Sequence, residues 1–466
     1  MELNSDELKN PTVGKLDGNP KIGWLCNKNG LLLKTYRWLA KNATGIILLI
    51  HGFRVHTRLA FMRINLKMPD NGEGVIVDSD NYYIYKDSWI EKFNQNGYSV
   101  YALDLQGHGE SQAVNNIRGD FSSFDDLVDD VIQYMDQIHD EISKDNQTDN
   151  DISNDDKTNH DILSDNEMND EPYDIVTTKK KKLPMYVIGY SMGGNIALRM
   201  LQVLNKEKGY KINTGESNEY KKCKAILDNS NNINEIDNDM NNSKYSDPGT
   251  SSASTSATTN AIVDDKDHVC YNYLDKFNIK GCISLSGMMR VKTPLVSGNK
   301  TIKYFYLPVA NLMSRVAPRV LVSTKTHYTR SEYVANICKY DKFRINNGLR
   351  FKCFAELIKA TIALRCDINY MPKNIPLLFV HSKDDTICCY KGSVSFHNKV
   401  DIEEKKLHIV NGMNHAITAE AGNEDVLNEI VNWISYVRSN DEDEKKLHIV
   451  EDIQHAITTE PGNEEF

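Results

Sequence analysis

The chain of 466 residues lacks the signatures of several large protein classes. It contains no run of 18 consecutive apolar residues, so we expect no helix that spans a bilayer. It has no CxxC pair that would suggest a zinc site, and with a net charge of -10 it has no basic domain for nucleic acid. We therefore predict a protein with no metal, no cofactor and no nucleic-acid partner.

The cysteines also fail to form the pattern of a secreted disulfide framework. Their number is nine, they are scattered, and Cys388 and Cys389 are adjacent, so we predict reduced thiols. Residues 1–21 are polar and lack the apolar core of a signal peptide. These observations predict an intracellular protein, either cytoplasmic or peripheral to a membrane.

Two long stretches are poor in apolar residues and rich in Asn, Asp, Ser and Thr. Residues 140–182 include Lys-Asp-Asn-Gln-Thr-Asp-Asn-Asp, and residues 205–270 include a run of only Ser, Ala and Thr from Ser251 to Thr259. Neither stretch has the apolar periodicity that would offset the entropy lost when a chain is ordered. We predict that both are disordered insertions.

The remaining sequence alternates apolar strands with amphipathic helices. The expected strands cover residues 45–50, 98–103, 185–188, 282–285, 377–380 and 406–410, and the expected helices cover 87–96, 124–142, 194–204 and 424–437. A continuous apolar run such as residues 45–50 is typical of a strand buried on both faces. The pattern predicts an α/β fold with a mostly parallel sheet flanked by helices.

This alternation stops between Leu285 and Pro376. There, the apolar segment Tyr304–Met313 and a helical pattern over Arg344–Cys366 predict a helical cap. The expected parts of the chain are a first core part (1–139), an insertion (140–182), a core strand with its turn and helix (183–204), a second insertion (205–270), a core strand (271–287), the cap (288–372), a last core part (373–439) and a duplicated tail (440–466).

A candidate nucleophile, Ser191, lies in the pentapeptide Gly189-Tyr190-Ser191-Met192-Gly193. The pentapeptide follows an expected strand and opens an expected helix. A Gly-x-Ser-x-Gly sequence in that context predicts a sharp turn that presents the serine hydroxyl. Such a hydroxyl needs a base to accept its proton, and the base needs an acid to orient it.

The acid and the base are expected after the last two strands, because the carboxyl ends of parallel strands meet at one edge of the sheet. Asp385 follows the strand at 377–380, and we prefer it to Asp384 because Thr-x-hydrophobic comes next. His415 follows the strand at 406–410. Ser191, Asp385 and His415 are thus the predicted catalytic residues.

An internal repeat offers a second candidate for the base. Residues 404–424 recur in similar form at 444–464, and the copy carries a second histidine loop around His455. We prefer His415 because Gly412 precedes it and an amphipathic helix follows it, whereas Asp452 replaces the glycine in the copy. Strand swapping by the second copy is the alternative.

A tetrahedral oxyanion needs two backbone N–H donors. We assign one to Met192, which follows the nucleophile, and the other to Phe53 in the turn His51-Gly52-Phe53. His108 lies in another polar turn after a strand, and we assign it a structural role in bracing the neighbouring loops.

Several motifs now stand together: His51-Gly52-Phe53, Asp104-x-x-Gly107-His108-Gly109-x-Ser111, Gly189-Tyr190-Ser191-Met192-Gly193-Gly194, Asp385 and His415. They resemble the monoacylglycerol lipase and lysophospholipase group of α/β-hydrolases. More narrowly, three further segments are similar to the lysophospholipase family expanded in malaria parasites: Asp80-Asn81-Tyr82-Tyr83-Ile84-Tyr85, Ser88-Trp89-Ile90 and Asn96-Gly97-Tyr98-Ser99-Val100-Tyr101. The resemblance covers roughly residues 21–439 without the insertions.

The resemblance implies an α/β-hydrolase fold, to which the residue pattern adds a helical cap and two disordered insertions. It implies a serine hydrolase that cleaves the acyl ester of a lysophospholipid or monoacylglycerol through an acyl-enzyme intermediate. Two alternatives stay open, a carboxylesterase or acyl-transferring enzyme of broader specificity and a catalytically silent scaffold. The expected partner is a lipid-like ester, with peripheral membrane contact through the cap as a further hypothesis, and the sequence sets no oligomeric state.

Overall fold

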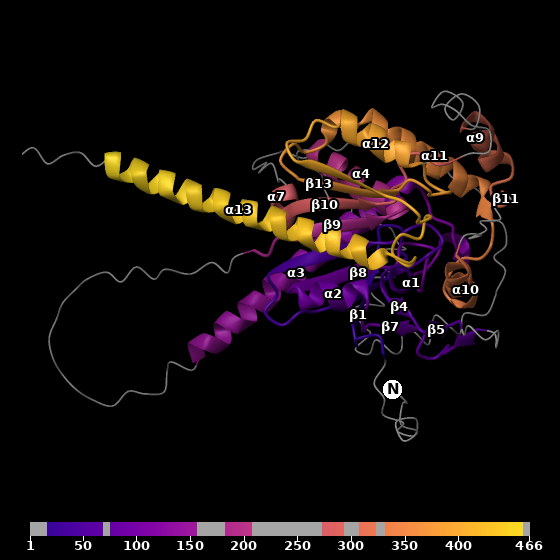
Figure 1. Cartoon of the computed structure of the whole chain (residues 1–466), viewed down its shortest axis with the longest axis horizontal. Helices are drawn as coiled ribbons and strands as arrows, with labels where there is room; N and C mark the ends of the chain where they lie inside the picture. Colours follow the sequence, from indigo (N-terminus) through magenta and orange to yellow (C-terminus); the bar gives the residue numbers. More distant parts are fainter. Residues whose placement is uncertain are drawn as a thin grey trace, which may run out of the picture.

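A sheet of eight strands forms the centre of the molecule, with helices on both faces (Figure 1). The computed structural model describes residues 16–68, 75–155, 182–206, 273–292, 307–322 and 331–459. The order across the sheet is β1 (Lys21–Cys26), β2 (Leu32–Trp38), β8 (Tyr98–Leu103), β3 (Gly45–Ile50), β9 (Met185–Tyr190), β10 (Ile279–Leu285), β13 (Leu377–Ser382) and β14 (Lys405–Val410).

The six strands from β8 to β14 are parallel, whereas β1 pairs with β2, and β2 with β8, in antiparallel fashion. The predicted α/β fold with a mostly parallel sheet is therefore confirmed. The sequence did not reveal β1 and β2. Polar side chains interrupt the apolar ones in β2, at Lys34, Thr35 and Arg37, so this strand lacks the continuous apolar run of the central strands.

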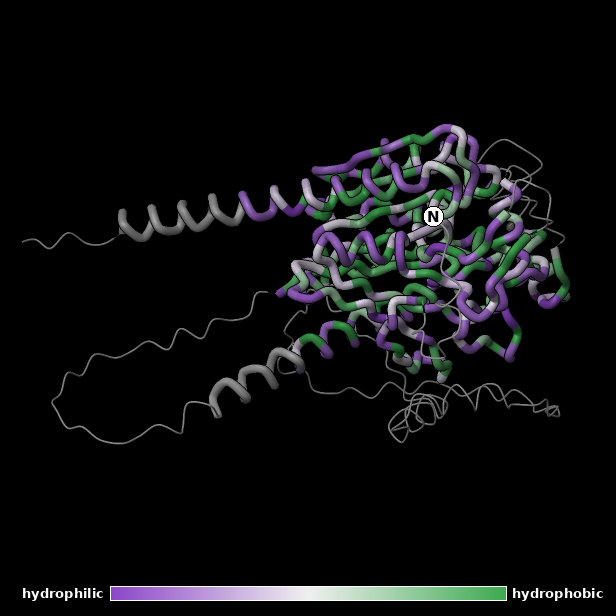
Figure 2. The backbone as a smooth tube through the Cα atoms, turned by 60° about the horizontal axis from the view of Figure 1, so that its bottom comes forward, coloured by the Kyte–Doolittle hydropathy of each residue, from purple (hydrophilic) through white to green (hydrophobic). Residues whose placement is uncertain are grey.

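The central strands separate two apolar cores. In β3, Ile46, Leu48 and Ile50 belong to one buried cluster, while Ile47 and Leu49 belong to the other. This alternation is what a strand buried on both faces requires, because successive side chains point to opposite faces. Figure 2 shows the hydrophobic stretches of the chain gathered in the middle of the fold.

Helices cover both faces of the sheet. The first cluster receives side chains from α3 (Phe124–Asp155), α4 (Met192–Lys206), α11 (Phe351–Cys366) and α12 (Tyr390–Lys399). The second receives them from α1 (Thr57–Phe61), α2 (Trp89–Gln95), α10 (Glu332–Tyr340) and the first part of α13 (Asn423–Thr459). Full burial of one such aliphatic side chain contributes about 1.5–3 kcal/mol.

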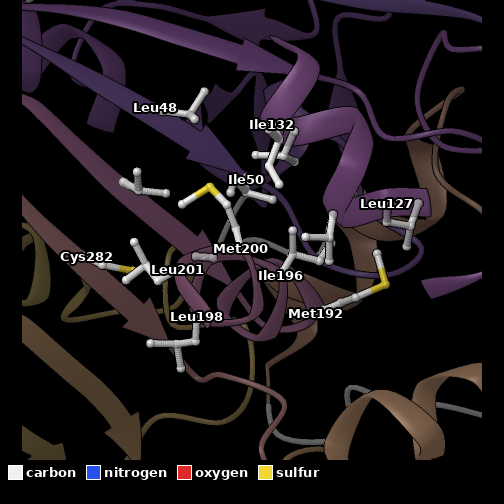
Figure 3. Packing of buried hydrophobic residues seen from close by; sticks show 14 of the residues in the cluster. Leu48, Ile50, Leu127, Ile132, Met192, Ile196, Leu198, Met200, Leu201 and Cys282 are labelled. Atoms are coloured by element: carbon white, nitrogen blue, oxygen red, sulfur yellow. The ribbon is translucent and has the colours of Figure 1, made fainter. Parts of the chain in front are cut away.

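Helix α4 follows the candidate nucleophile and is almost entirely buried. Figure 3 shows its Ile196 and Met200 close to Ile50 of β3 and Ile132 of α3. Packing on these sides fixes the amino terminus of α4, where Met192 is the first helical residue.

The region between β10 and β13 contains helices, as the cap prediction expects. It holds α9 (Leu307–Val316), α10, α11, the short strands β11 (Leu321–Val322) and β12 (Leu349–Arg350), and the 3-10 turn η3 (Ile368–Tyr370). The other short elements are β4 (Arg63–Ile64), β5 (Leu66–Lys67), β6 (Ile76–Val77), β7 (Tyr83–Ile84), η1 (Val114–Asn116) and α7 (Tyr273–Phe277).

The structure differs from three of the predictions made from the sequence. Helix α3 continues to Asp155, beyond residue 140, where we expected the first insertion to begin; the rest of that insertion and nearly all of the second lie outside the described residues. Helix α13 continues to Thr459 and leaves the body of the fold, so the second copy forms a helix where a second histidine loop was expected (Figure 1). Cys26 is disulfide-bonded, which contradicts the prediction of reduced thiols at that position.

No helix in the described part of the chain is long and apolar enough to cross a membrane.

Candidate active site

Ser191 lies in a strained turn between β9 and α4. Its φ of 56° falls in the left-handed region, which costs a residue with a side chain about 1–3 kcal/mol. A Cβ on Gly193 would lie 2.2 Å from the carbonyl oxygen of Ile50, so only glycine fits there beside β3. The turn is held in place because the Ser191 N–H donates to the Leu285 oxygen at 2.8 Å and the Ser191 oxygen accepts from Met288 N–H at 3.0 Å.

The structure brings the three predicted catalytic side chains together. Nε2 of His415 lies 2.8 Å from Oγ of Ser191, and Nδ1 of His415 lies 2.7 Å from Oδ2 of Asp385. All three residues are buried, at 8%, 4% and 0% exposed in the order Ser191, His415, Asp385. When Nδ1–H donates to the carboxylate, Nε2 is left as an acceptor for the serine hydroxyl, which is the arrangement that activates a nucleophile.

The Asp385 carboxylate is held by hydrogen bonds on both oxygens. Oδ1 accepts from the N–H groups of Ile387 at 2.7 Å and Cys388 at 2.8 Å, while Oδ2 faces His415. Burial alone would raise the pKa of Asp385, but the charge interaction and hydrogen bond with His415 outweigh it and hold the pKa well below its usual range. Nε2 of His381 lies 3.3 Å from the same oxygen and adds to this effect. Asp385 is therefore a carboxylate at neutral pH.

Asp384 has a different role from its neighbour. Its Oδ2 accepts from the Gly412 N–H at 2.9 Å, so it ties the acid turn to the loop that carries His415.

Glu420 anchors the loop that carries the base, and the sequence reading did not find it. Its buried carboxylate accepts from the N–H groups of Asn414 and Ala416, the two neighbours of His415, the second at 3.2 Å. The hydroxyl of Tyr190 donates to the His415 carbonyl at 3.1 Å. The backbone is thus fixed at three consecutive residues. The sequence shows an acid five residues after a candidate base, but neither its burial nor its two backbone partners.

Two N–H groups are candidates for an oxyanion site beside Ser191. Met192 is the first residue of α4, so its N–H has no carbonyl four residues back within the helix. Among the described residues, the Phe53 N–H has no hydrogen-bond acceptor. The turn that carries Phe53 passes beside the nucleophile, because a Cβ on Gly52 would lie 2.9 Å from Cβ of Ser191.

His51 fixes the orientation of that turn. Its Nε2 accepts from the Leu105 N–H at 2.9 Å, so the proton resides on Nδ1, which donates to the Gly52 oxygen at 2.8 Å. The Gly52 oxygen and the Phe53 N–H belong to one planar peptide and point in opposite directions. Burial lowers the pKa of His51 to about 4, which keeps the ring neutral.

His108 braces the same turn, as expected. Its ring packs against the Phe53 ring with centroids 5.4 Å apart, and Nδ1 lies 2.9 Å from the Gln106 oxygen. Burial lowers the pKa of His108 to about 3, so this ring too is neutral.

A thiol also lies in the turn that carries the acid. Cys388, three residues after Asp385, is buried, and its N–H donates to Oδ1 of Asp385. Burial, with the neighbouring Asp385 charge, raises the pKa of the Cys388 thiol well above its usual range. Because only a thiolate is a strong nucleophile, Cys388 does not compete with Ser191.

No group of three or more metal-ligating side chains occurs in the part of the chain that the structure describes.

Comparisons with known proteins agree with this architecture. The family described as Hydrolase_4, serine aminopeptidase S33, matches residues 80–148 and 268–422, so Asp385 and His415 lie inside the matched ranges and Ser191 lies outside them. An uncharacterized abhydrolase domain-containing protein of Dictyostelium discoideum is 27% identical over 159 residues, which are 33% of this chain and 16% of that protein. The chain thus spans only a small part of that relative's length.

One solved structure shows the likeness of fold. A soluble variant of monoglyceride lipase from Saccharomyces cerevisiae, in complex with a substrate analog, superposes with a TM-score of 0.53 at 16% identity, over 92% of this chain and 98% of that chain. A monoacylglycerol lipase of Paleococcus ferrophilus gives 0.47 at 14% identity, over 87% of this chain and 99% of that chain. The mostly parallel sheet with its flanking helices, together with this likeness, shows that the chain has an α/β-hydrolase fold.

Proposed function

We propose that the protein is a serine hydrolase that cleaves the acyl ester of a monoacylglycerol or lysophospholipid. The proposal rests on two consecutive contacts. Oγ of Ser191 lies 2.8 Å from Nε2 of His415, and Nδ1 of His415 lies 2.7 Å from Oδ2 of Asp385. A hydroxyl, an imidazole and an ionised carboxylate in this order form the apparatus of acyl transfer. A silent scaffold would have no need of a strained serine in contact with a buried histidine.

The proposed reaction proceeds in two stages. Oγ of Ser191 attacks the ester carbonyl carbon while Nε2 of His415 takes its proton, and Asp385 stabilises the imidazolium that results. The N–H groups of Phe53 and Met192 bind the oxyanion. The imidazolium then gives its proton to the leaving alcohol, which leaves an acyl group on Ser191. Water, deprotonated by His415, hydrolyses this acyl-enzyme and restores the serine.

The lipid-like substrate is supported by the inserted helical region. Its helix α9 exposes apolar side chains, with Val309 at 45%, Leu312 at 62% and Val316 at 74% exposed. The similar monoglyceride lipase was solved with a substrate analog. The finer likeness to malaria lysophospholipases, which rests on sequence motifs, makes a lysophospholipid the other candidate substrate.

A hydrolysis panel tests the proposal. The wild type and Ser191→Ala would be assayed on monoacylglycerol, lysophosphatidylcholine, a short-chain p-nitrophenyl ester and an aminoacyl p-nitroanilide. We expect the wild type to prefer one of the lipids and Ser191→Ala to be inactive on all of them. A preference for the short-chain ester would favour the broader carboxylesterase, and a preference for the anilide would favour a peptidase. Activity that survives in Ser191→Ala would overturn the mechanism.

Peripheral membrane contact is a second part of the proposal. Of the expected contact segment, Leu307–Met313 lies in α9, while Tyr304–Tyr306 fall outside the described residues. We expect Leu312→Glu with Val316→Glu to lower co-flotation with liposomes. Tyr436→Glu is the matched control, because Tyr436 is 55% exposed on α13. Equal flotation of the two variants would contradict the membrane contact.

A further inference from the structure

The segment 341–346, between α10 and β12, lies directly against the turn that carries Phe53. Asp341, which begins it, is buried, and its Oδ1 accepts from the N–H groups of Phe343 at 2.8 Å and Arg344 at 2.7 Å. These two bonds fold the segment into a tight turn. The inserted region thus presents an ordered piece of backbone to the core.

Three hydrogen bonds join Arg54 to this segment. The Arg54 carbonyl accepts from the Ile345 N–H at 3.1 Å, Nε donates to the Ile345 oxygen at 2.9 Å, and Nη2 donates to the Asn346 oxygen at 3.1 Å. Arg54 is only 9% exposed, although its side chain is charged. Its guanidinium matches two carbonyls at a fixed spacing, which a lysine could not do.

The backbone of Arg54 is itself unusual. Its φ of 69° is left-handed, a conformation that residues with a side chain adopt only when their surroundings impose it. Arg54 directly follows Phe53, whereas His51 lies two residues before it. His51 therefore holds the turn before the Phe53 N–H, and the bonds of Arg54 to Ile345 and Asn346 hold it after the Phe53 N–H.

A second contact joins the same two pieces of chain. Nε2 of His56 lies 3.1 Å and 3.2 Å from the two oxygens of Asp341, and the hydroxyl of Tyr83 donates to Oδ2 at 2.9 Å. His56, Tyr83 and Asp341 are all buried. The turn 51–57 is therefore joined to the inserted region at two positions, Arg54 and His56.

From these contacts we infer that Arg54 is a positioning residue of the oxyanion site, through which segment 341–346 sets the place of the Phe53 N–H. The inference rests on the proposed hydrolase function. It makes the inserted region part of the catalytic apparatus, in addition to covering the substrate. Removal of the guanidinium should lower the stabilisation of the tetrahedral oxyanion and leave ground-state binding of the ester unchanged.

The test compares Arg54→Ala with Arg118→Ala. Arg118 also donates to this segment, at the Phe343 carbonyl, but its other acceptor is Gly109, outside the oxyanion turn. For Arg54→Ala we expect kcat on the preferred ester to fall by about 10–100-fold, part of the ~10²–10³-fold loss of a whole oxyanion donor. KM should change less than about twofold. Affinity for an alkylboronic acid, which forms a tetrahedral adduct with Ser191, should fall in parallel with kcat. Arg118→Ala should retain wild-type kcat.

An equal loss of kcat in the two variants would overturn the inference, as would a loss confined to KM. If Arg54→Ala does not fold, Arg54→Lys decides, since lysine reaches one carbonyl at most. A folded Arg54→Lys with wild-type kcat contradicts the inference, and a several-fold lower kcat with the wild-type KM supports it. Failure of the proposed function is distinct, because the wild type would then hydrolyse no ester and form no boronate adduct.

Discussion

The heptad Glu-Lys-Lys-Leu-His-Ile-Val occurs twice in this chain, and its two copies adopt different secondary structures. In the first copy, Lys405 to Val410 form β14, which pairs in parallel with β13. The second, at residues 444–450, lies within helix α13. Since the seven residues are identical, their own propensity cannot decide the structure, and the surroundings must.

The surroundings of the first copy stabilise a strand and the loop that follows it. The edge of β13 supplies hydrogen-bond partners, Asp384 accepts from Gly412 after the strand, and Glu420 fixes the two neighbours of His415. The second copy instead continues a helix that is already formed at Asn423, and extending a helix is easier than starting one. A histidine in the right sequence is therefore not a base unless the fold places it.

The histidines of the two copies should differ most in their effect on activity. We expect His415→Ala to lower kcat/KM on the preferred ester by at least about 10³-fold, because Ser191 loses its proton acceptor. His455→Ala should leave kcat/KM unchanged. The reverse result would mean that the second copy supplies the base, as strand swapping would require.

The acids that follow the two histidines provide the next comparison. Glu420→Ala removes the acceptor of two buried N–H groups, so we expect a loss of about 1–3 kcal/mol in the free energy of unfolding. A displaced His415 should lower kcat by about 10–100-fold. Glu460 stands at the same place in the second copy, and Glu460→Ala is the control with no expected change. Urea unfolding and ester kinetics measure both effects, and a Glu420→Ala variant with wild-type kcat would show that the loop needs no such anchor.

The loop glycine should have a smaller effect. Gly412 has a φ of 80° and a Cβ there would touch nothing within 4 Å, so Gly412→Asp should cost the backbone strain of about 1–2 kcal/mol, to which repulsion between the new carboxylate and Asp384 adds. That substitution copies Asp452 of the second copy. Gly412→Asn should cost less, because asparagine tolerates this conformation better. Thermal unfolding would rank the three proteins, and a Gly412→Asp protein as stable as wild type would contradict the role we give to this glycine.

Removal of the second copy should have the smallest effect. A chain that ends at Asp443 keeps the ion pair between Lys280 and Asp441 at 2.7 Å. We expect its free energy of unfolding to stay within about 0.5 kcal/mol of the full chain, as for changes away from packed features. Its kcat/KM should also be unchanged. A several-fold loss of activity would show that the tail contributes to the site.

The strands of the core could be predicted where burial on both faces leaves a continuous apolar run, as in β3 and β8, whose bounds agree with the expected ones. The order of Ser191, Asp385 and His415 along the chain was enough to suggest that they meet. The anchors of the site could not be predicted in this way. Glu420 and Arg54 act through backbone groups, and the contact from Arg54 to Ile345 joins residues far apart in sequence. The structure of the second heptad could not be predicted either, because the heptad forms a strand only where a sheet edge is there to pair with it.

Ser191 acts as a nucleophile only if His415 accepts its proton. The most direct test is to label the folded protein with a fluorophosphonate and locate the adduct by mass spectrometry of its peptides. We expect one adduct on Ser191 in the wild type, none in Ser191→Ala, and strongly slowed labelling in His415→Ala. A folded wild type that takes no label, or takes it at another residue, would show that Ser191 is not the activated nucleophile.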